Sequence, residues 1–342
     1  MVEIAKPYLA FLGDGTSAAQ CKTAFGLRDW CPGDLVGQFG LPGCTVDLGI
    51  PWLVPHEAAA LGARSLVIGV APVGGSIPQA WWPVLFLALE GGLDIVSGMH
   101  TRLAEIPELA NAAAANGRRL HDVRHTERAF GVATGRRRSG RRLLTVATDC
   151  AIGKKYAALA ITKALRSRGV AADFRATGQT GILIAGSGVA IDAVVCDFVA
   201  GAAESLSPAG AVDHWDIVEG QGALSHPAYA GVTMGLVHGT QPDALVLCHD
   251  TTRPHLLGYP EYPMPDLQAA MEQYLAAARL TNPQVRFVAV TLNTSGQTHL
   301  EREDLYSRLS DRFGLPVCDP IREGCAAIAD RLLTEFPLGT VS

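Results

Sequence analysis

The sequence predicts an α/β protein with two parallel-sheet domains, a Rossmann-like N-terminal domain followed by a P-loop-like C-terminal domain. Three observations favour this class. The chain of 342 residues is too long for one ordinary hydrophobic core. Short apolar runs alternate with helical segments along both halves of the chain. Residues 136–142, "RRRSGRR", read as an Arg-rich linker, which gives domains 1–135 and 143–342.

The expected strands of the N-terminal half end in Gly or polar residues, and helical segments lie between them. These strands are 8–15, 65–75, 93–100 and 118–125. The helices are 56–63, 81–92 and 106–117. Such alternation implies parallel strands with crossover helices, whose ligands bind at the carboxyl ends of the strands. His100 and Arg102, which follow a strand, are therefore candidate ligand contacts.

The C-terminal half repeats this rhythm. Its expected strands are 142–148, 170–177, 214–222, 243–250, 285–296 and 315–320. Its expected helices are 153–169, 264–280 and 322–336. Residues 191–206 read as a further helix, or as a strand that leads into one.

Composition excludes several classes of protein. Hydrophobic residues make up 48% and charged residues 18% of the chain, which is typical of a well-packed soluble α/β protein. The formal net charge of −5 disfavours a general nucleic-acid binder. The eight cysteines are scattered without a CxxC pair, so we expect reduced thiols rather than a disulfide framework or a zinc site.

No segment of the N-terminal half has the pattern of an export signal or a membrane span. The stretch "MVEIAKPYLAFLGDG" lacks a cleavable signal pattern. The most apolar run, "WWPVLFLALEGGLDIV", contains Pro83 and Glu90 and is too short to span a bilayer. We therefore expect a cytoplasmic protein without a membrane partner.

The stretch "TDCAIGKK", residues 148–155, has the context of a phosphate-binding loop, because a strand precedes it and a helix begins at Gly153 and Lys154. Backbone N–H groups, the positive end of the helix and a lysine attract phosphate in such loops. The expected anion-binding residues are Thr148, Asp149, Cys150, Ala151, Ile152, Gly153, Lys154 and Lys155.

Lys155 breaks the P-loop pattern at the position where Ser or Thr holds magnesium. An ammonium group has three donors and no lone pair, so it cannot coordinate a cation. We expect no metal here, and a phosphate ligand that arrives without magnesium. Coenzyme A is such a ligand, because its phosphates are charged but none is transferred.

The C-terminal half is similar to dethiobiotin synthetase and related P-loop proteins. Besides the loop, "DIVEGQG" (216–222) resembles their strand that ends in Glu-Gly. The run "VTLNTSG" (290–296) resembles their strand whose Asn reads an adenine edge. This resemblance implies base recognition by Asn293, for which a strand-terminal turn is the alternative.

Three longer blocks resemble the D-glutamate N-acetyltransferase family over essentially the whole chain. They are "TDCAIGKKYAALAITKALRSRG", "ATGQTGILIAGSGVAIDAVVCDFVAGAAESL" and "VEGQGALSHPAYAGVTMGLVHG". The resemblance implies the two folds named above and transfer of an acetyl group from acetyl-CoA to a D-amino acid, best attested for D-glutamate. It also implies a partner dehydrogenase that oxidises the N-acetylated product. We further expect a homo-oligomer.

Acetyl transfer to an amine needs a general base and N–H donors for the oxyanion. We expect Glu219, at a strand end, as the first candidate base, then His226, then Asp197. Glu219 as an orienting group and His226 as a turn residue are the alternatives. A covalent acyl intermediate on Cys150 is a weaker alternative.

The substrate needs polar and cationic partners. Gln179 and Thr180 in "ATGQTG" are candidates for contact near the acyl group. Because arginine binds carboxylates bidentately, Arg102, Arg175 and Arg253 are candidates for a dicarboxylate, together with His100.

Two other functions compete with the transferase. An ATP-dependent kinase or ligase of the dethiobiotin synthetase type is disfavoured by Lys155. A non-catalytic nucleotide-binding module is disfavoured by the polar residues at the strand ends of both halves.

Overall fold

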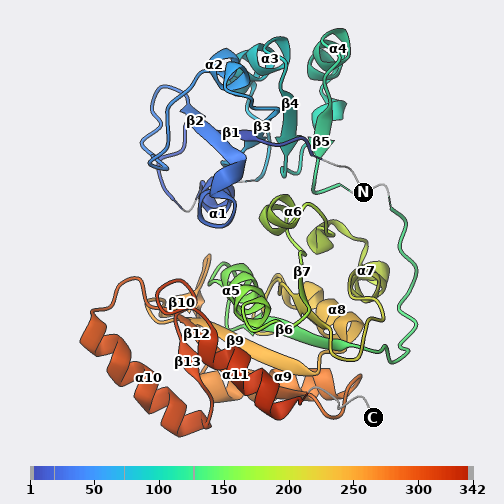
Figure 1. The fold of residues 1–342 in the computed structure, drawn as a ribbon, viewed down its shortest axis with the longest axis vertical. Coiled ribbons are helices and arrows are strands. Elements are labelled where there is room, and N and C mark those ends of the chain that lie inside the picture. The colour runs from blue at the N-terminus through green and yellow to red at the C-terminus, as the bar shows by residue number, and fades with distance from the viewer. Residues whose placement is uncertain (1–3, 19, 73, 126–127, 338–342) are drawn as a thin grey trace. The chain divides into compact units, whose positions relative to one another are not determined.

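The computed structural model describes residues 4–18, 20–72, 74–125 and 128–337. The chain forms two compact units (Figure 1). Unit 1 contains Met1–Arg128 and Gly178–Ala193, and unit 2 contains Ala129–Thr177 and Val194–Ser342. Both units are built on parallel sheets, so the expected fold class is confirmed.

Unit 1 has a five-stranded sheet in the order β2-β1-β3-β4-β5, in which all pairs are parallel. The strands are β1 (Tyr8–Gly13), β2 (Leu35–Gly40), β3 (Ser65–Ile68), β4 (Asp94–Ser97) and β5 (Leu120–Asp122). The helices are α1 (Lys22–Trp30), α2 (Pro55–Ala60), α3 (Trp82–Glu90), α4 (Pro107–Ala115) and α6 (Gln179–Ala185). In Figure 1, α2, α3 and α4 lie on one face of this sheet and α1 and α6 on the other.

Helix α6 supplies part of the core of unit 1 although its residues follow β7 of unit 2. Leu183, only 2% exposed, packs in one buried cluster with Leu27, Val67 and Val96. These partners lie on α1, β3 and β4. A parallel sheet needs apolar cover on both faces, and α1 alone covers only part of this one.

The structure therefore differs from the expected domain 143–342, because Gly178–Ala193 is part of unit 1. The chain passes between the units after Arg128, after Thr177 and after Ala193. Burial of α6 against the first sheet accounts for this arrangement, since Leu183 would otherwise be exposed.

Unit 2 has a six-stranded sheet in the order β13-β12-β9-β6-β8-β7, again with parallel pairs. The strands are β6 (Arg141–Ala147), β7 (Ala172–Arg175), β8 (Trp215–Val218), β9 (Ala244–Asp250), β12 (Arg286–Asn293) and β13 (Val317–Cys318). A separate hairpin joins β10 (His255–Leu256) and β11 (Tyr259–Pro263). The helices are α5 (Lys154–Arg166), α7 (Val199–Leu206), α8 (Ala230–Thr240), α9 (Leu267–Arg279), α10 (His299–Phe313) and α11 (Ala326–Glu335).

Strand β6 lies between β8 and β9, and this order positions the site. The carboxyl ends of parallel strands meet at one edge of a sheet. The loop after β6 is therefore flanked by the residues that follow β8 and β9, which include Glu219 and Arg253.

The Arg-rich stretch is not a solvated linker. Arg142 belongs to β6 and is 2% exposed. The guanidinium of Arg138 donates to the carbonyl oxygens of Glu204, Ser207, Gly239 and Thr240, at the ends of α7 and α8. Carbonyl groups at helix C-termini lack partners within the helix, so they can accept hydrogen bonds from this guanidinium in place of water.

Residues 191–206 do not form one helix. Short 3₁₀ turns occupy Ile191–Ala193 and Cys196–Phe198, and α7 begins only at Val199. The chain leaves unit 1 between the two turns, which explains the interruption. Elements that the sequence reading did not identify are α1, β2, α6, α8, β10, β11 and α10.

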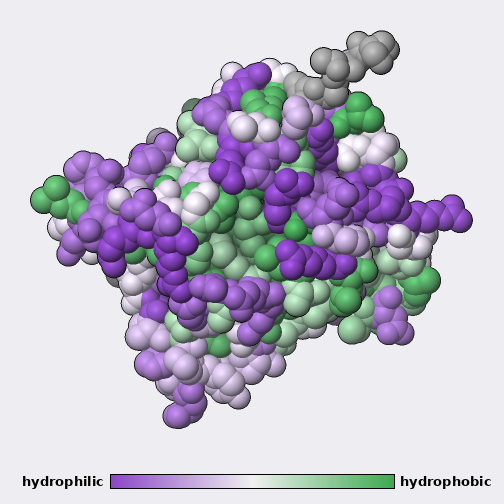
Figure 2. All heavy atoms as spheres, turned by 90° about the horizontal axis from the view of Figure 1, so that it is seen from below, coloured by the Kyte–Doolittle hydropathy of each residue, from purple (hydrophilic) through white to green (hydrophobic). Residues whose placement is uncertain are grey.

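No helix within the described ranges is long and apolar enough to cross a membrane. Figure 2 shows the face seen from below in Figure 1, where apolar side chains gather in the middle and hydrophilic ones surround them.

Candidate functional site

The loop between β6 and α5 has the backbone of an anion cradle. Ala151 and Gly153 adopt left-handed conformations, with φ of 52° and 106°, which turn the chain sharply before the helix. Ile152 is buried with Ala147 and Cys248 in a small apolar cluster, and this packing holds the turn in place. The first N–H groups of α5 are therefore presented at a rigid loop.

Arg253 holds this loop from the outside. Its guanidinium donates to the carbonyl oxygens of Cys150 and Ala151, both at 2.9 Å, and to Oδ2 of Asp149 at 3.1 Å. A trans peptide directs its N–H opposite to its C=O, so the N–H groups of Ala151 and Ile152 point away from Arg253. The arginine thus fixes which side of the loop faces a ligand, and its fork is already occupied by the loop.

Lys154 is 7% exposed, and its Nζ donates to the carbonyl oxygen of Asp149 at 2.9 Å. Burial lowers the pKa of Lys154, while the charges of Cys150, Cys248, Asp149 and Glu219 oppose this shift. The next residue, Lys155, places Nζ 4.9 Å from the centre of the Tyr156 ring. The loop therefore holds one buried cation and has no hydroxyl at position 155.

Glu219 follows β8 and is 4% exposed. Its Oε2 accepts the N–H of Thr177 at 3.0 Å, while the Thr177 hydroxyl donates to the carbonyl oxygen of Glu219 at 2.6 Å. This pair of bonds fixes the last residue of unit 2 before the chain enters α6. The carboxylate also contributes to the charge that favours the Lys154 ammonium.

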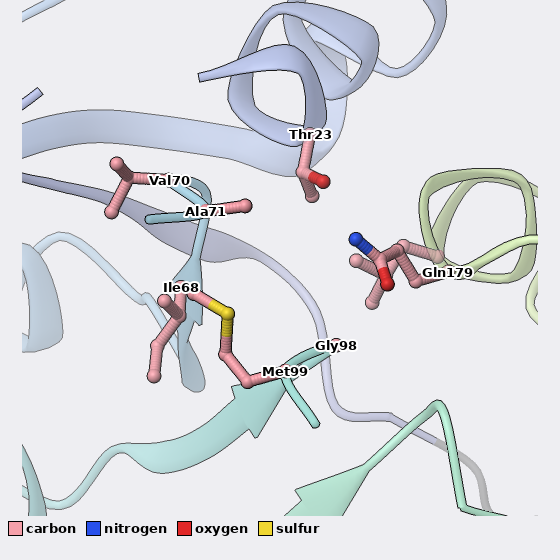
Figure 3. A pocket seen from close by; sticks show the side chains of 8 residues that line it. Thr23, Ile68, Val70, Ala71, Gly98, Met99 and Gln179 are labelled. Carbon is pink, nitrogen blue, oxygen red and sulfur yellow. The ribbon is translucent and has the colours of Figure 1, made fainter. Parts of the chain in front are cut away.

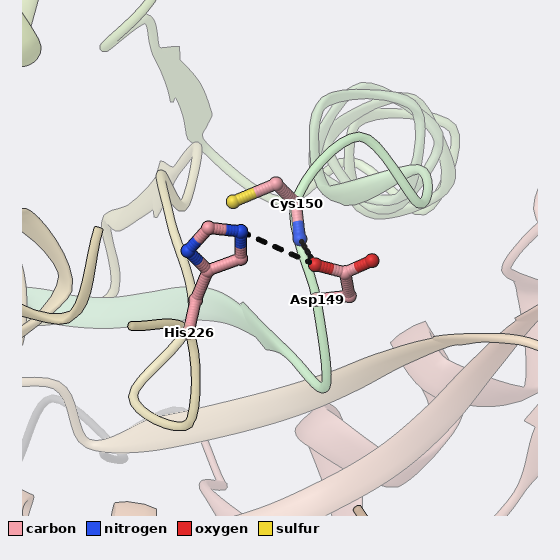
Figure 4. A group of neighbouring side chains, drawn as sticks. All are labelled: Asp149, Cys150 and His226. Atoms are coloured by element: carbon pink, nitrogen blue, oxygen red, sulfur yellow. Dashed lines mark hydrogen bonds and ion pairs between the residues drawn. The ribbon is translucent and has the colours of Figure 1, made fainter. Parts of the chain in front are cut away.

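Asp149, Cys150 and His226 form a cluster at the start of the loop (Figure 4). One carboxylate oxygen, the thiol sulfur and one imidazole nitrogen lie within 4.8 Å of one another. His226 is 1% exposed, and its Nε2 lies 3.9 Å from Oδ1 of Asp149. Oδ1 accepts the N–H of Cys150 at 2.6 Å, and Oδ2 accepts the N–H of Leu257 at 2.9 Å.

The tautomer of His226 follows from a backbone contact. Ala228 donates its N–H to Nδ1 of His226 at 3.2 Å, so Nδ1 is an acceptor and the neutral ring carries its proton on Nε2. Among the residues that the structure describes, Nε2 has no hydrogen-bond partner. In this form the Nε2–H can donate a hydrogen bond to a ligand acceptor, but Nε2 offers no lone pair to a metal ion or a substrate proton.

A second set of polar side chains lies at the carboxyl ends of β9 and β12. Arg253 Nε lies 3.4 Å from Oδ2 of Asp250, which also accepts the side-chain amide of Asn293 at 2.9 Å. Thr148 shares a hydrogen bond of 2.9 Å with Nδ1 of His249, whose pKa is lowered by burial. Asn293 is thus linked to the loop through Asp250 and Arg253, a connection that the sequence reading missed. The position of Asp250 at the end of a strand was the available signal.

Two further candidates of unit 2 are placed differently. Arg175 donates to Oδ1 of Asp216 at 2.7 Å and to Oδ2 of Asp173 at 3.3 Å, in a cluster with His214. Asp197 is exposed in the turn before α7. Neither side chain takes part in the hydrogen bonds found around the loop within the described part of the chain.

The candidates Gln179 and Thr180 lie in unit 1, at the start of α6. The hydroxyl of Thr180 shares a bond of 2.8 Å with that of Thr23, and the Gln179 carbonyl oxygen accepts from Arg124 at 3.3 Å. Figure 3 shows Gln179 directed toward the space that Thr23 and Met99 also line, beyond the ends of β3 and β4.

The other two candidates of unit 1 are exposed. His100 follows β4, and its backbone carbonyl oxygen lies 3.0 Å from Nε2 of His125. Arg102 Nε lies 3.8 Å from Oε1 of Glu105, and the Arg102 side chain is 53% exposed.

The fold and the loop define a P-loop-type α/β protein with a Rossmann-like unit. Comparison with known families agrees with this class. Residues 130–329 match the family model DUF1611, described as a domain of unknown function with a P-loop domain. Residues 40–126 match the DUF1611_N model, described as a Rossmann-like domain.

Relatives match nearly the full length of the chain. A protein from Pseudoalteromonas sp, named D-glutamate N-acetyltransferase, is 46% identical over 97% of this chain and 100% of its own. A protein of the same name from Tritonibacter scottomollicae is 48% identical over 96% and 99%. The crystal structure of a DUF1611 family protein from Anabaena variabilis superposes with a TM-score of 0.86 and 32% identity, over 96% and 99% of the two chains. The chain therefore belongs to the DUF1611 family, and it is an enzyme.

Proposed function

We propose that this enzyme transfers the acetyl group of acetyl-CoA to the amine of a D-amino acid, with D-glutamate as the first candidate. The observation that supports this most is the match to two proteins named D-glutamate N-acetyltransferase over almost the whole chain. Both halves of the chain are covered by these matches, so the proposal concerns the complete two-unit enzyme.

The loop after β6 is suited to the phosphates of coenzyme A. The N–H groups of Ala151 and Ile152 point away from Arg253, and Lys154 adds a buried positive charge. Lys155 offers no lone pair for magnesium, which suits a ligand whose phosphates are bound but not transferred. We also propose that Asn293 contacts the adenine, as the strand-end position implies.

The chemistry of the transfer needs a proton acceptor and donors for the oxyanion. We assign the acceptor to Glu219, since His226 presents a proton at Nε2 and Asp197 lies in an exposed turn. His226 is then assigned to hydrogen-bond donation toward a ligand oxygen, because its Nε2–H is buried and directed into the cluster.

Recognition of a substrate carboxylate requires an uncommitted cation. Arg253 is engaged by the loop and Arg175 by Asp216 and Asp173. Arg102 is half exposed and its contact with Glu105 is long, so its guanidinium is available for a carboxylate ligand and Arg102 stays our candidate for this role. We further propose that a dehydrogenase oxidises the N-acetylated product and that the enzyme is a homo-oligomer.

The test is an assay of the full chain with acetyl-CoA and a panel of D- and L-amino acids. We expect release of free thiol with D-glutamate and formation of N-acetyl-D-glutamate, identified by its mass. Turnover should not change when magnesium is removed with a chelator. Thiol release at background with every amine, together with magnesium-dependent ATP hydrolysis, would instead favour the kinase or ligase alternative.

A further inference from the structure

The cysteines of this chain differ sharply in their surroundings. Cys21 and Cys248 are buried, and burial raises the pKa of each to about 11. Burial also raises the pKa of Cys31. Such thiols stay protonated and react slowly. Cys150 is only partly buried, and it lies on the loop after β6, four residues before Lys154, the first residue of the 13-residue helix α5.

Two groups beside Cys150 stabilise a negative sulfur. The buried ammonium of Lys154 donates to the carbonyl oxygen of the preceding residue, Asp149, at 2.9 Å, and its charge interacts with Cys150. His226 brings an imidazole nitrogen within 4.8 Å of the cluster atoms, and its Nε2–H lacks an acceptor among the described residues. A cation, a buried donor and a helix N-terminus are the conditions that activate a cysteine.

Carboxylates face the same thiol and oppose this effect. Asp149 lies within the cluster, and Glu219 interacts with Lys154. The charge of Asp149 is balanced by Arg253, whose Nη1 lies 3.1 Å from Oδ2. Backbone N–H groups of Cys150 and Leu257 occupy its two oxygens as well. The carboxylate is therefore compensated, while the donor on His226 is not.

We propose that Cys150 is a reactive thiol and a site of reversible modification by hydrogen peroxide, which acts on the ligand-binding loop. In this step the Cys150 thiolate attacks one peroxide oxygen, an S–O bond forms and the O–O bond breaks. Hydroxide leaves and takes up a proton to give water. The sulfur is oxidised to a sulfenic acid and the peroxide is reduced.

The modified sulfur would change the loop directly. Its new oxygen is an acceptor in the cluster that holds the Nε2–H of His226, a donor that otherwise faces a ligand. The inference rests on the proposed function only in its consequence, namely that oxidation weakens binding of coenzyme A. The reactivity of Cys150 itself rests on the groups around the sulfur and not on the identity of the ligand.

The test compares two thiols of the unmodified full chain. Cys196 is exposed in the turn before α7 and serves as the matched control. The folded protein is treated with a limiting amount of iodoacetamide, and alkylation of each cysteine peptide is followed by mass spectrometry. We expect Cys150 to react about tenfold faster than Cys196 despite its lower exposure. An equal or slower rate at Cys150 would overturn the proposal.

Peroxide provides the second readout. After treatment, dimedone should label Cys150 and not Cys196, and a thiol reductant should prevent the labelling. In the variant Lys154→Met, whose folding is checked by circular dichroism, alkylation of Cys150 should slow by about tenfold relative to Cys196. An unchanged ratio in a folded variant would contradict the assigned role of the ammonium.

Coenzyme A separates this inference from the proposed function. If the loop binds coenzyme A, saturating ligand should slow alkylation of Cys150 and leave Cys196 unchanged. Fast alkylation without protection would support the reactive thiol and contradict coenzyme A binding at the loop. Peroxide should lower the affinity for coenzyme A in the wild type, whereas the Cys150→Ser variant should show the same affinity before and after treatment.

Discussion

Lys154 is a cation inside the protein rather than on its surface. Its side chain is 7% exposed and its Nζ is bonded to the carbonyl oxygen of Asp149. Removing a charged group from water disfavours its ionised form, which is why burial lowers the pKa of Lys154. A bound phosphate would add a countercharge and so favour the ammonium form further.

The first prediction concerns this charge. Lys154→Met should weaken binding of acetyl-CoA by about 1.5–3 kcal/mol, the range for a charged hydrogen bond. Because burial lowers the pKa of Lys154, wild-type affinity should fall as pH rises, and this fall should occur at lower pH than for an ordinary lysine. Titration calorimetry across this pH range measures both effects.

The control for that measurement is Lys163→Met, at an exposed position of the same helix. Its affinity and pH dependence should match those of the wild type. Equal affinities for Lys154→Met and the wild type would show that the loop does not hold the cofactor.

The second prediction concerns Glu219. Glu219→Gln retains an oxygen that can accept the N–H of Thr177, but it cannot take up a proton. The kcat should fall by about 10²- to 10⁴-fold, with the KM for acetyl-CoA and the melting temperature nearly unchanged. Wild-type turnover in this variant would remove Glu219 as the base and leave it an anchor for Thr177.

Individual residues could be predicted from the sequence where the cause is local. The loop residues 148–155 follow a strand and open a helix, and this context is readable in the chain. The hydrogen bonds and ion pairs of Arg175 and Arg253 could not be predicted from the sequence, because their partners lie far away along the chain. The tautomer of His226 depends on the backbone N–H of Ala228, which only the folded turn brings into place.

At the scale of secondary-structure elements, one glycine, Gly220, allows the chain after β8 to pack closely against β6. A Cβ on Gly220 would lie 1.7 Å from the carbonyl oxygen of Thr145 and 3.0 Å from Cδ of Lys154. The Gly220 N–H donates to the hydroxyl of Thr145 at 3.0 Å, which holds the residues after β8 beside strand β6.

The third prediction follows from this contact. Gly220→Ala should destabilise the enzyme by at least about 1–3 kcal/mol, the usual cost of overpacking, and should weaken acetyl-CoA binding through Lys154. Gly231→Ala is the control, since an added Cβ there meets nothing within 4 Å in helix α8. The control should unfold at the same temperature as the wild type or higher. Thermal melts that do not separate the two variants would contradict the packing argument.

Most strands could be predicted because buried parallel strands are continuous apolar runs. Strands β6, β9 and β12 are of this kind. Helix α6 was missed because its seven residues, "QTGILIA", are too few for a helical period to show. Arg138 and Arg142 were assigned to a linker because nothing in the local sequence reveals the carbonyl acceptors that bury them.

The two units are interleaved in sequence at the scale of the whole molecule. Unit 1 draws Gly178–Ala193 from the middle of the P-loop half, and Leu183 of that segment joins its core. The sequence predicted two parallel-sheet units, but it did not predict that residues 178–193 belong to the first of them. A contiguous division is the simplest assumption when only the linear order is known.

The fourth prediction tests the contribution of this segment. Replacing residues 178–193 with a Gly/Ser linker of equal length should remove apolar cover from the first sheet. Hydrogen exchange at β3 and β4 should then be much faster, while β6 and β9 keep their protection. As a control, Leu300→Ser on α10, an 80% exposed position, should leave both units unchanged. Unaltered exchange at β3 and β4 in the linker variant would show that unit 1 is complete without α6.

The interleaving also sets an order of events during translation. The strands of unit 1, from β1 to β5, leave the ribosome well before α6, which covers one face of their sheet. Domains generally fold as they emerge, and exposed apolar faces at that stage promote misassembly. The first sheet therefore stays without its α6 cover while the 56 residues between Asp122 and Gln179 are synthesised. The N-terminal half of the chain therefore cannot complete the core of unit 1 until α6 has been synthesised.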